Sequence, residues 1–183
     1  MKRVILLGAE STGKTTMAKQ LARHFNTHWV PEYGREHWEN KVAGLSMNDT
    51  LPSWSSDEFI HIAKEQQRRE DLAARTANRF LICDTNAFAT GTWHERYYQQ
   101  RDERVDQIGA NSKADLYLIT APDVPFVQDG FRDGERIREW MDSRFMEQLR
   151  HGRVPWKRIE GPYAGRLAQA IEEIETVLKR PAS

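Results

Sequence analysis

The stretch that decides the fold is GAESTGKTT, residues 8–16. It matches the pattern G-x-x-x-x-G-K-[ST] at every fixed position. A short apolar run, RVILLG (3–8), precedes it, and KTTMAKQLARHF (14–25), with apolar residues at helical spacing, follows it. A glycine-rich turn between a strand and a helix presents backbone N–H groups and a helix N-terminus to an anion. The sequence therefore predicts a phosphate-binding loop.

The residue types in this loop have separate expected roles. Gly8 and Gly13 allow the tight turn, Lys14 can reach the β- and γ-phosphates of ATP, and the Thr15 hydroxyl can ligate Mg²⁺. No role is expected for the side chains of Glu10 and Ser11. The loop residues expected to contact ATP are Gly8, Ala9, Glu10, Ser11, Thr12, Gly13, Lys14, Thr15 and Thr16.

Strands and helices are expected to alternate along the chain. Apolar runs that do not alternate are typical of strands covered on both faces, and they occur at 3–8, 28–34, 79–85, 115–120 and 156–161. Amphipathic helices are expected at 14–25, 55–77, 134–152 and 164–180, and a surface loop at 43–54. This order predicts an α/β fold of three layers, a P-loop NTPase fold in which helices flank a mostly parallel five-stranded sheet.

Composition limits the classes of function. The chain has 183 residues, which favours a single domain over 1–183, and its 27 Lys and Arg balance 27 Asp and Glu, which argues against a nucleic-acid partner. No apolar run approaches the roughly 20 residues of a membrane span. The single cysteine, Cys83, is expected as a small buried hydrophobe and cannot form an internal disulfide. We expect a cytoplasmic protein that binds small molecules, with no obligate protein partner evident.

A second carboxylate is expected near the loop. Asp84 ends the predicted strand 79–85, at the position where phosphate-loop proteins anchor magnesium. We favour a metal role for Asp84, direct or through water. Two alternatives stay open: Asp84 caps the turn through the backbone of Thr85 or Asn86, or it holds substrate hydroxyls.

The surrounding sequence argues against two classes of phosphate-loop protein. Motor ATPases usually carry a glutamate directly after the strand-end aspartate, whereas Asp84 is followed by Thr85. A GTPase needs [NT]-K-x-D after a strand, but SKAD (112–115) precedes the strand 115–120, and no D-x-x-G follows the strand 79–85. A small-molecule kinase instead needs a carboxylate near the acceptor hydroxyl and an arginine-bearing lid.

The lid is expected at about 129–152, where two Asp-Gly pairs would supply flexible joints. Arg132 is the favoured phosphate contact, and Arg136 is a second candidate. Arg138 is expected on a solvated helix face, paired with Asp142 four residues further on.

The acceptor side is expected around Glu32, at the edge of the sheet where ligands bind in open α/β folds. The segment 64–75 is expected mainly as a solvated helix face, from which Gln66 or Arg69 could touch substrate. Aromatic rings near the strand ends would suit a nucleobase or a pyridine ring, and a cationic ring would gain cation–π attraction. Ordinary packing is the alternative for each of these rings, which belong to Trp29, Tyr33, Trp38, Trp93 and Tyr97.

Four motifs together resemble the ribosylnicotinamide kinase domain of bacterial NadR-type proteins. They are GAESTGKTTMAKQLARHFNTHWVPEYGRE (8–36), IAKEQQRRE (62–70), ICDTNAFATGTW (82–93) and DGFRD (129–133). The resemblance runs in order over most of the chain, and PEYGRE and DTNAFAT are more specific than the phosphate loop. It implies a nucleoside and nucleotide kinase fold, and ATP-dependent phosphorylation of the 5′-hydroxyl of nicotinamide riboside to give nicotinamide mononucleotide.

The resemblance also implies roles for the residues in matching motifs. Lys14 serves the phosphates, Arg132 closes the lid, and Glu32, with Asp84 as the alternative, orients or deprotonates the acceptor hydroxyl. EGPYAGR (160–166) follows the last strand, where related kinases hold adenine. The residues implied on the acceptor side are Glu32, Tyr33, Arg35, Asp84 and Trp93, and those on the adenine side are Pro162 and Tyr163.

Three points limit the transfer of function. The full-length bacterial proteins carry an adenylyltransferase domain, and some carry a DNA-binding domain, so those roles are not transferred to these 183 residues. The segment 43–54 lies near the expected acceptor side and leaves the acceptor open. The alternatives are therefore a kinase for another small nucleoside or alcohol, and a nucleotide-binding switch or sensor.

Overall fold

The computed structural model describes residues 1–46, 49–126 and 136–179, with the side chains of residues 136, 178 and 179 left out. These ranges contain five strands and seven helices, and one or two helices follow each strand. In chain order they are β1 (Lys2–Leu7), α1 (Lys14–His24), β2 (Trp29–Val30), α2 (Tyr33–Val42), α3 (Ser56–Ala73), β3 (Phe80–Asp84), α4 (Ala87–Tyr98), α5 (Glu103–Ala110), β4 (Leu116–Thr120), α6 (Arg136–Arg150), β5 (Trp156–Ile159) and α7 (Tyr163–Lys179).

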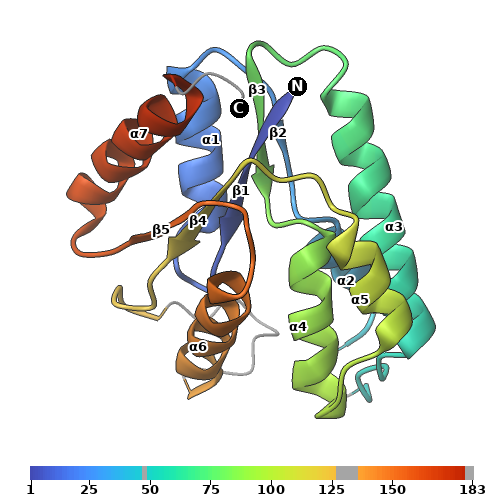
Figure 1. The fold of residues 1–183 in the computed structure, drawn as a ribbon. Helices are drawn as coiled ribbons and strands as arrows, with labels where there is room; N and C mark the ends of the chain where they lie inside the picture. The colour runs from blue at the N-terminus through green and yellow to red at the C-terminus, as the bar shows by residue number, and fades with distance from the viewer. Residues whose placement is uncertain (47–48, 127–135, 180–183) are drawn as a thin grey trace.

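The five strands form one parallel sheet in the order β2-β3-β1-β4-β5 (Figure 1). Helices lie on both faces of the sheet, with α1 and α7 on one side and α3, α4 and α5 on the other side of the view. The predicted three-layer α/β fold is confirmed, and the sheet is entirely parallel.

Strand β1 lies at the centre of the sheet and contributes to both cores. Val4 and Leu6 pack against α1 and α7, while Ile5 and Leu7 pack against α4 and α6. All four side chains are completely buried. Since burying such a side chain contributes roughly 1.5–3 kcal/mol, this strand holds the two layers of helices together. The prediction of strands covered on both faces is confirmed for β1, β3 and β4, whereas Trp29 in β2 is only half-buried and Lys157 in β5 is exposed.

Three helices were not predicted from the sequence. Helix α2 is mostly polar and buries only Val42, and α5 has eight residues. Helix α4 (AFATGTWHERYY) contains glycine and threonine, which are weak helix formers, and buries Ala87, Ala89, Gly91 and Thr92. Helices α2 and α4 lack the single apolar stripe by which the longer helices were recognised, and α5 is short.

The prediction for Cys83 is confirmed, because Cys83 is completely buried, which raises the pKa of its thiol. At the start of α3, Ser55 caps the helix in a reciprocal capping box with Glu58. Across the part of the chain that the structure describes, no helix combines the length and the apolar character that a membrane span requires.

Candidate active site

The carboxyl ends of the five strands meet at one edge of the sheet, and the candidate site lies there. The phosphate loop follows β1, Glu32 follows β2, and Asp84 ends β3. Thr120 ends β4, and the turn at Gly161 follows β5. Parallel sheets place ligands at this edge because the loops after the strands converge there.

The backbone of the phosphate loop requires glycine at both ends. Gly8 has φ +144°, and a Cβ atom there would lie 2.4 Å from the Thr120 hydroxyl oxygen. Gly13 has φ +86°, and its Cβ would lie 2.5 Å from the Tyr163 hydroxyl. Ser11, between them, also has a positive φ of +52°. The loop therefore takes a conformation that a side chain at either glycine would obstruct.

Polar side chains fix the loop from within. The Thr12 hydroxyl donates to the Ala9 carbonyl at 2.8 Å and lies 2.7 Å from the Thr120 hydroxyl. The Lys14 ammonium also donates to the Ala9 carbonyl, at 2.7 Å. Lys14 is only 9% exposed, so its ammonium group lies against the loop and is largely shielded from solvent.

Thr15 and Asp84 lie together at the start of α1. The Thr15 hydroxyl donates to Asp84 Oδ2 at 2.5 Å. Asp84 is buried, and its Oδ1 has no hydrogen-bond partner among the described residues. A hydroxyl beside an ionisable carboxyl, with one carboxylate oxygen still available, provides the hard oxygen donors that Mg²⁺ prefers. The donor set fits the predicted metal site.

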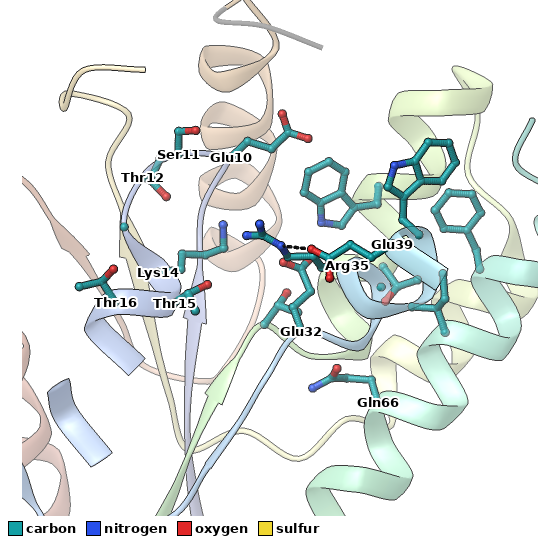
Figure 2. A pocket seen from close by; sticks show the side chains of 18 of the residues that line it. Glu10, Ser11, Thr12, Lys14, Thr15, Thr16, Glu32, Arg35, Glu39 and Gln66 are labelled. Atoms are coloured by element: carbon teal, nitrogen blue, oxygen red, sulfur yellow. Dashed lines mark hydrogen bonds and ion pairs between the residues drawn. The ribbon is translucent and has the colours of Figure 1, made fainter. Parts of the chain in front are cut away.

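One cleft of about 620 Å³ runs from the phosphate loop to the helices beyond β2 and β3 (Figure 2). Lys14 lies on one side of it, and Glu32 and Arg35 on the other. The residues that line the cleft are Glu10, Ser11, Thr12, Gly13, Lys14, Thr15, Thr16, Glu32, Gly34, Arg35, Trp38, Glu39, Trp54, Phe59, Ile62, Gln66, Thr85, Thr90, Trp93, Tyr97, Pro125 and Tyr163.

The end of the cleft away from the phosphate loop is aromatic. Trp38 and Trp54 stack with ring centroids 4.8 Å apart and planes 25° apart. Tyr97 and Phe59 lie against Trp54, with centroids 5.5 Å and 5.1 Å from it. Trp93 lines the cleft as predicted, whereas Trp29 packs against the core beside α1. A flat ring bound here would meet several aromatic faces.

Carboxylates lie between the aromatic end and the phosphate loop. Glu32 and Glu39 line the cleft, and both also line an adjoining cavity of about 400 Å³ that reaches Asp84. Arg35 Nε donates to Glu39 Oε1 at 2.9 Å. Glu32 is thus near both the predicted metal ligands and the predicted acceptor pocket.

Tyr33 faces helix α3. Its hydroxyl lies 2.9 Å from His61 Nε2, and the Arg69 guanidinium lies 4.3 Å from its ring centroid. The Tyr33 backbone N–H donates to Gln66 Oε1 at 2.9 Å. Gln66 is 1% exposed and lines the cleft, at one of the two positions of segment 64–75 that were expected to be able to touch substrate. The prediction that this segment is mainly a solvated helix face is wrong at Glu70, which is completely buried.

The side chain of Glu10 has a partner, contrary to the expectation that it has no role. Its Oε1 accepts a hydrogen bond from Arg96 Nη1 at 3.1 Å. The Arg96 guanidinium lies over the rings of Trp93 and Tyr97, at 5.1 Å and 4.9 Å from their centroids. The phosphate loop is therefore tied to helix α4, which bears part of the aromatic wall.

The prediction for Arg138 is wrong. Arg138 is 2% exposed, and its Nη2 donates to the Val124 carbonyl at 2.9 Å. Asp142, its predicted partner, accepts a hydrogen bond from Arg158 at 2.8 Å. Arg138 lies on the face of α6 that meets Val124, in the segment after β4, so its guanidinium is enclosed by protein. Arg132 and the side chain of Arg136 lie outside the described residues, and their phosphate roles stay predictions.

Most predicted site residues converge on this edge of the sheet. Gly8 and Ala9 form the base of the loop, and Pro162 precedes Tyr163 at the start of α7. Three of the cleft residues missed from the sequence lie in helices α2 and α4, two lie in α3, and three lie in loops. These missed residues are Gly34, Glu39, Trp54, Phe59, Ile62, Thr85, Thr90 and Pro125. A tryptophan in an irregular segment is a signal in the sequence that could have drawn attention to Trp54. Its stacking on Trp38 could not be predicted, because the two residues are brought together only by the fold.

Comparison with known proteins gives relatives of two kinds that match most of the chain. The trifunctional NAD biosynthesis/regulator proteins NadR of Salmonella typhimurium and Escherichia coli are each 26% identical over 181 residues, covering 97% of this chain and 43% of each relative. The thymidylate kinase of Wolbachia pipientis is 27% identical over 161 residues, covering 79% of each chain. This chain therefore spans less than half the length of the NadR proteins that it matches.

Solved structures share the fold. A NadR protein in complex with NR matches all of this chain and 53% of its own with a TM-score of 0.79 and 24% identity. The thymidylate kinase of Ehrlichia chaffeensis matches 97% of this chain and 98% of its own with a TM-score of 0.61 and 16% identity. The resemblance to NadR-type kinase domains is confirmed. A family model described as an AAA domain matches residues 3–166, so the chain belongs to the AAA domain family.

Proposed function

We propose that this chain is an ATP-dependent kinase that phosphorylates the 5′-hydroxyl of nicotinamide riboside. The observation that carries the proposal is one continuous cleft, which joins a phosphate loop to a chamber of stacked aromatic rings. The pyridinium ring of nicotinamide riboside is flat and cationic, so aromatic faces and nearby carboxylates would both attract it. The NadR relatives, and the solved NadR structure in complex with NR, support this choice of acceptor.

Each group of residues at the cleft has a separate proposed role in the phosphoryl transfer. Lys14 and the loop amides would hold the β- and γ-phosphates, and Thr15 and Asp84 would hold Mg²⁺, which neutralises phosphate charge when bound. Glu32 would orient the acceptor hydroxyl, with Asp84 as the alternative base. Arg132 is proposed as the lid residue that neutralises the transferring group. Positioning and charge neutralisation supply most of the rate in such reactions.

An acceptor panel with coupled detection of ADP tests the proposal. The panel contains nicotinamide riboside, its neutral dihydro form, thymidine monophosphate, uridine and a reaction without acceptor. We expect ADP release to depend on nicotinamide riboside and to be slower with the dihydro form, which lacks the ring charge. Faster turnover of thymidine monophosphate or uridine would assign the chain to another acceptor. Acceptor-independent hydrolysis alone would indicate a switch or sensor.

A matched pair of variants locates the acceptor. Trp54→Leu removes one of the stacked rings that line the cleft, whereas Trp29→Leu removes a ring that packs against the core. Trp54→Leu should raise the KM for nicotinamide riboside and leave the KM for ATP unchanged. Trp29→Leu should change neither constant. Equal effects of the two variants would contradict the placement of the acceptor ring.

A further inference from the structure

Arg166, in the first turns of α7, is one of the two largest fully buried side chains among the described residues, with 1% exposure. Its three nitrogens donate to three backbone carbonyls: Nε to Gly161 at 2.8 Å, Nη1 to Thr12 at 3.1 Å and Nη2 to Ala121 at 3.2 Å. The guanidinium also forms an ion pair with Asp123. The planar guanidinium spreads its N–H donors over three nitrogens in fixed directions, whereas a lysine carries all its donors on one nitrogen.

The groups held by Arg166 come from three separate segments at the ligand-binding edge of the sheet. Thr12 belongs to the phosphate loop, and Ala121 and Asp123 follow β4. Gly161 lies in the turn between β5 and α7, where φ is +83°. Asp123 Oδ2 accepts the Gly161 N–H at 2.7 Å, so the turn is held through both its N–H and its carbonyl.

The phosphate loop and this turn are adjacent in space. Tyr163, directly after the turn, lines the cleft, and its hydroxyl lies where a Cβ on Gly13 would be. Arg166 lies behind both segments, with its guanidinium 6.0 Å from the centroid of the Tyr163 ring. Arg166 therefore links the phosphate loop directly to the turn.

We propose that Arg166 is a positioning residue for the nucleotide, which fixes the turn at Gly161–Tyr163 relative to the phosphate loop so that base and phosphates bind together. The inference rests on the proposed use of a nucleotide as phosphate donor. Arg166 is not expected to contact the nucleotide itself, because its N–H groups already donate to backbone carbonyls. It acts by holding the backbone of the phosphate loop and of the turn in place. Fixing two contact segments before binding lowers the ordering cost of a ligand that spans them.

The role predicts a selective loss of affinity when Arg166 is replaced. Without Arg166 the phosphate loop keeps the bonds of Thr12 to Ala9 and Thr120. A phosphate chain alone should therefore still bind well. A ligand that needs the loop and the turn together should bind more weakly. A merely structural role would weaken both ligands equally or neither of them.

Calorimetric titration with ADP and with inorganic tripolyphosphate, both with Mg²⁺, separates these cases. In Arg166→Lys we expect the Kd for ADP to rise by roughly tenfold or more and that for tripolyphosphate by less than about threefold. Asp123→Ala, at a side chain that is 39% exposed, frees the turn with less risk to folding and should give the same selective pattern. Arg3→Lys is the matched control, because Arg3 is also buried and ion-paired, with Glu70, in β1.

The inference is overturned if the loss of ADP affinity does not exceed the loss of tripolyphosphate affinity by about threefold in either variant. It is also overturned if Arg3→Lys shows the same selective loss. A parent protein that does not bind ADP would overturn the proposed function and this inference together. A parent that binds ADP but phosphorylates no acceptor would overturn only the proposed kinase activity.

Discussion

Lys14 is the residue whose charge should matter most for turnover. It is nearly buried and lies across the loop, where it donates to the Ala9 carbonyl. For Lys14→Ala we expect turnover to fall by roughly 10²- to 10³-fold, as when one donor to developing charge is removed. The variant should stay folded, since the loop keeps its threonine contacts. Steady-state kinetics and a thermal melt monitored by circular dichroism measure the two quantities.

The control for Lys14 is Lys113→Ala, because Lys113 is a lysine with a 71% exposed side chain remote from the cleft. It should leave turnover unchanged. Full activity in Lys14→Ala, or loss of folding without loss of turnover per folded molecule, would contradict the assigned role.

Asp84 is the residue on which metal dependence should rest. Its carboxylate accepts the Thr15 hydroxyl and has a second oxygen without a partner among the described residues. Chelation of divalent ions should abolish turnover, and added Mg²⁺ should restore it. In Asp84→Asn the Mg²⁺ concentration for half-maximal turnover should rise by roughly 10- to 100-fold, the range seen when metal-supporting groups are changed. Asp57→Asn, with an 85% exposed side chain, is the control. An unchanged Mg²⁺ requirement in Asp84→Asn would argue against the site.

Helix α3 illustrates how one element supports the site. It contributes Phe59, Ile62 and Gln66 to the cleft wall, and its N-terminus is held by the Ser55–Glu58 capping box. Burial opposes ionisation of Glu58, but hydrogen bonds from Lys41, His37 and Ser55 lower its pKa to about 2. The first turn of α3 is therefore fixed by charge as well as by capping.

Ser55→Ala removes the side-chain acceptor for the Glu58 N–H. We expect the free energy of unfolding to fall by about 1 kcal/mol, the usual cost of losing such a cap. Urea denaturation at pH 7 measures this change. Ser53→Ala, two residues earlier and outside the box, should have a much smaller effect. Equal stability of the two variants would show that the box contributes nothing.

At the scale of the whole molecule, a buried ion pair joins the central strand to helix α3. Arg3 Nη1 donates to Glu70 Oε2 at 3.1 Å, and Glu70 Oε1 accepts from Gln66 Nε2 at 3.1 Å. Burial raises the pKa of Glu70 to about 7, against the opposing effects of Gln66 and Arg3. Because the ordinary glutamate value is 4.5, the contribution of Glu70 to stability is complete below about pH 4.5 and is lost as the pH rises through about 7.

Glu70→Gln should remove this pH dependence. Between pH 5 and pH 8 the parent should lose more free energy of unfolding than the variant, because only the parent must deprotonate a buried carboxyl. Urea denaturation at the two pH values measures the difference. Glu103→Gln, an exposed position in α5, should behave like the parent. Parallel pH profiles for parent and Glu70→Gln would contradict the raised pKa.

The order of the five strands and the phosphate loop could be predicted because their signals are local. Continuous apolar runs marked the strands, and fixed spacing marked the loop and its neighbouring helix. Helices α2 and α4 were missed because polar or small residues hide their periodicity, and they carry much of the cleft wall. The acceptor half of the site was therefore the less predictable half.

Local signals in the sequence were enough to predict a mostly parallel α/β fold with a phosphate loop and an aspartate at the end of β3, because the hydrophobic period and turn chemistry of each segment depend only on near neighbours. The tertiary structure alone decided which distant residues meet. It paired Glu10 with Arg96, stacked Trp38 on Trp54, and enclosed Arg138 and Arg166. The residue types that make these contacts are typical of solvated surfaces or of ordinary cores. Only packing removes water from them and gives each its partner.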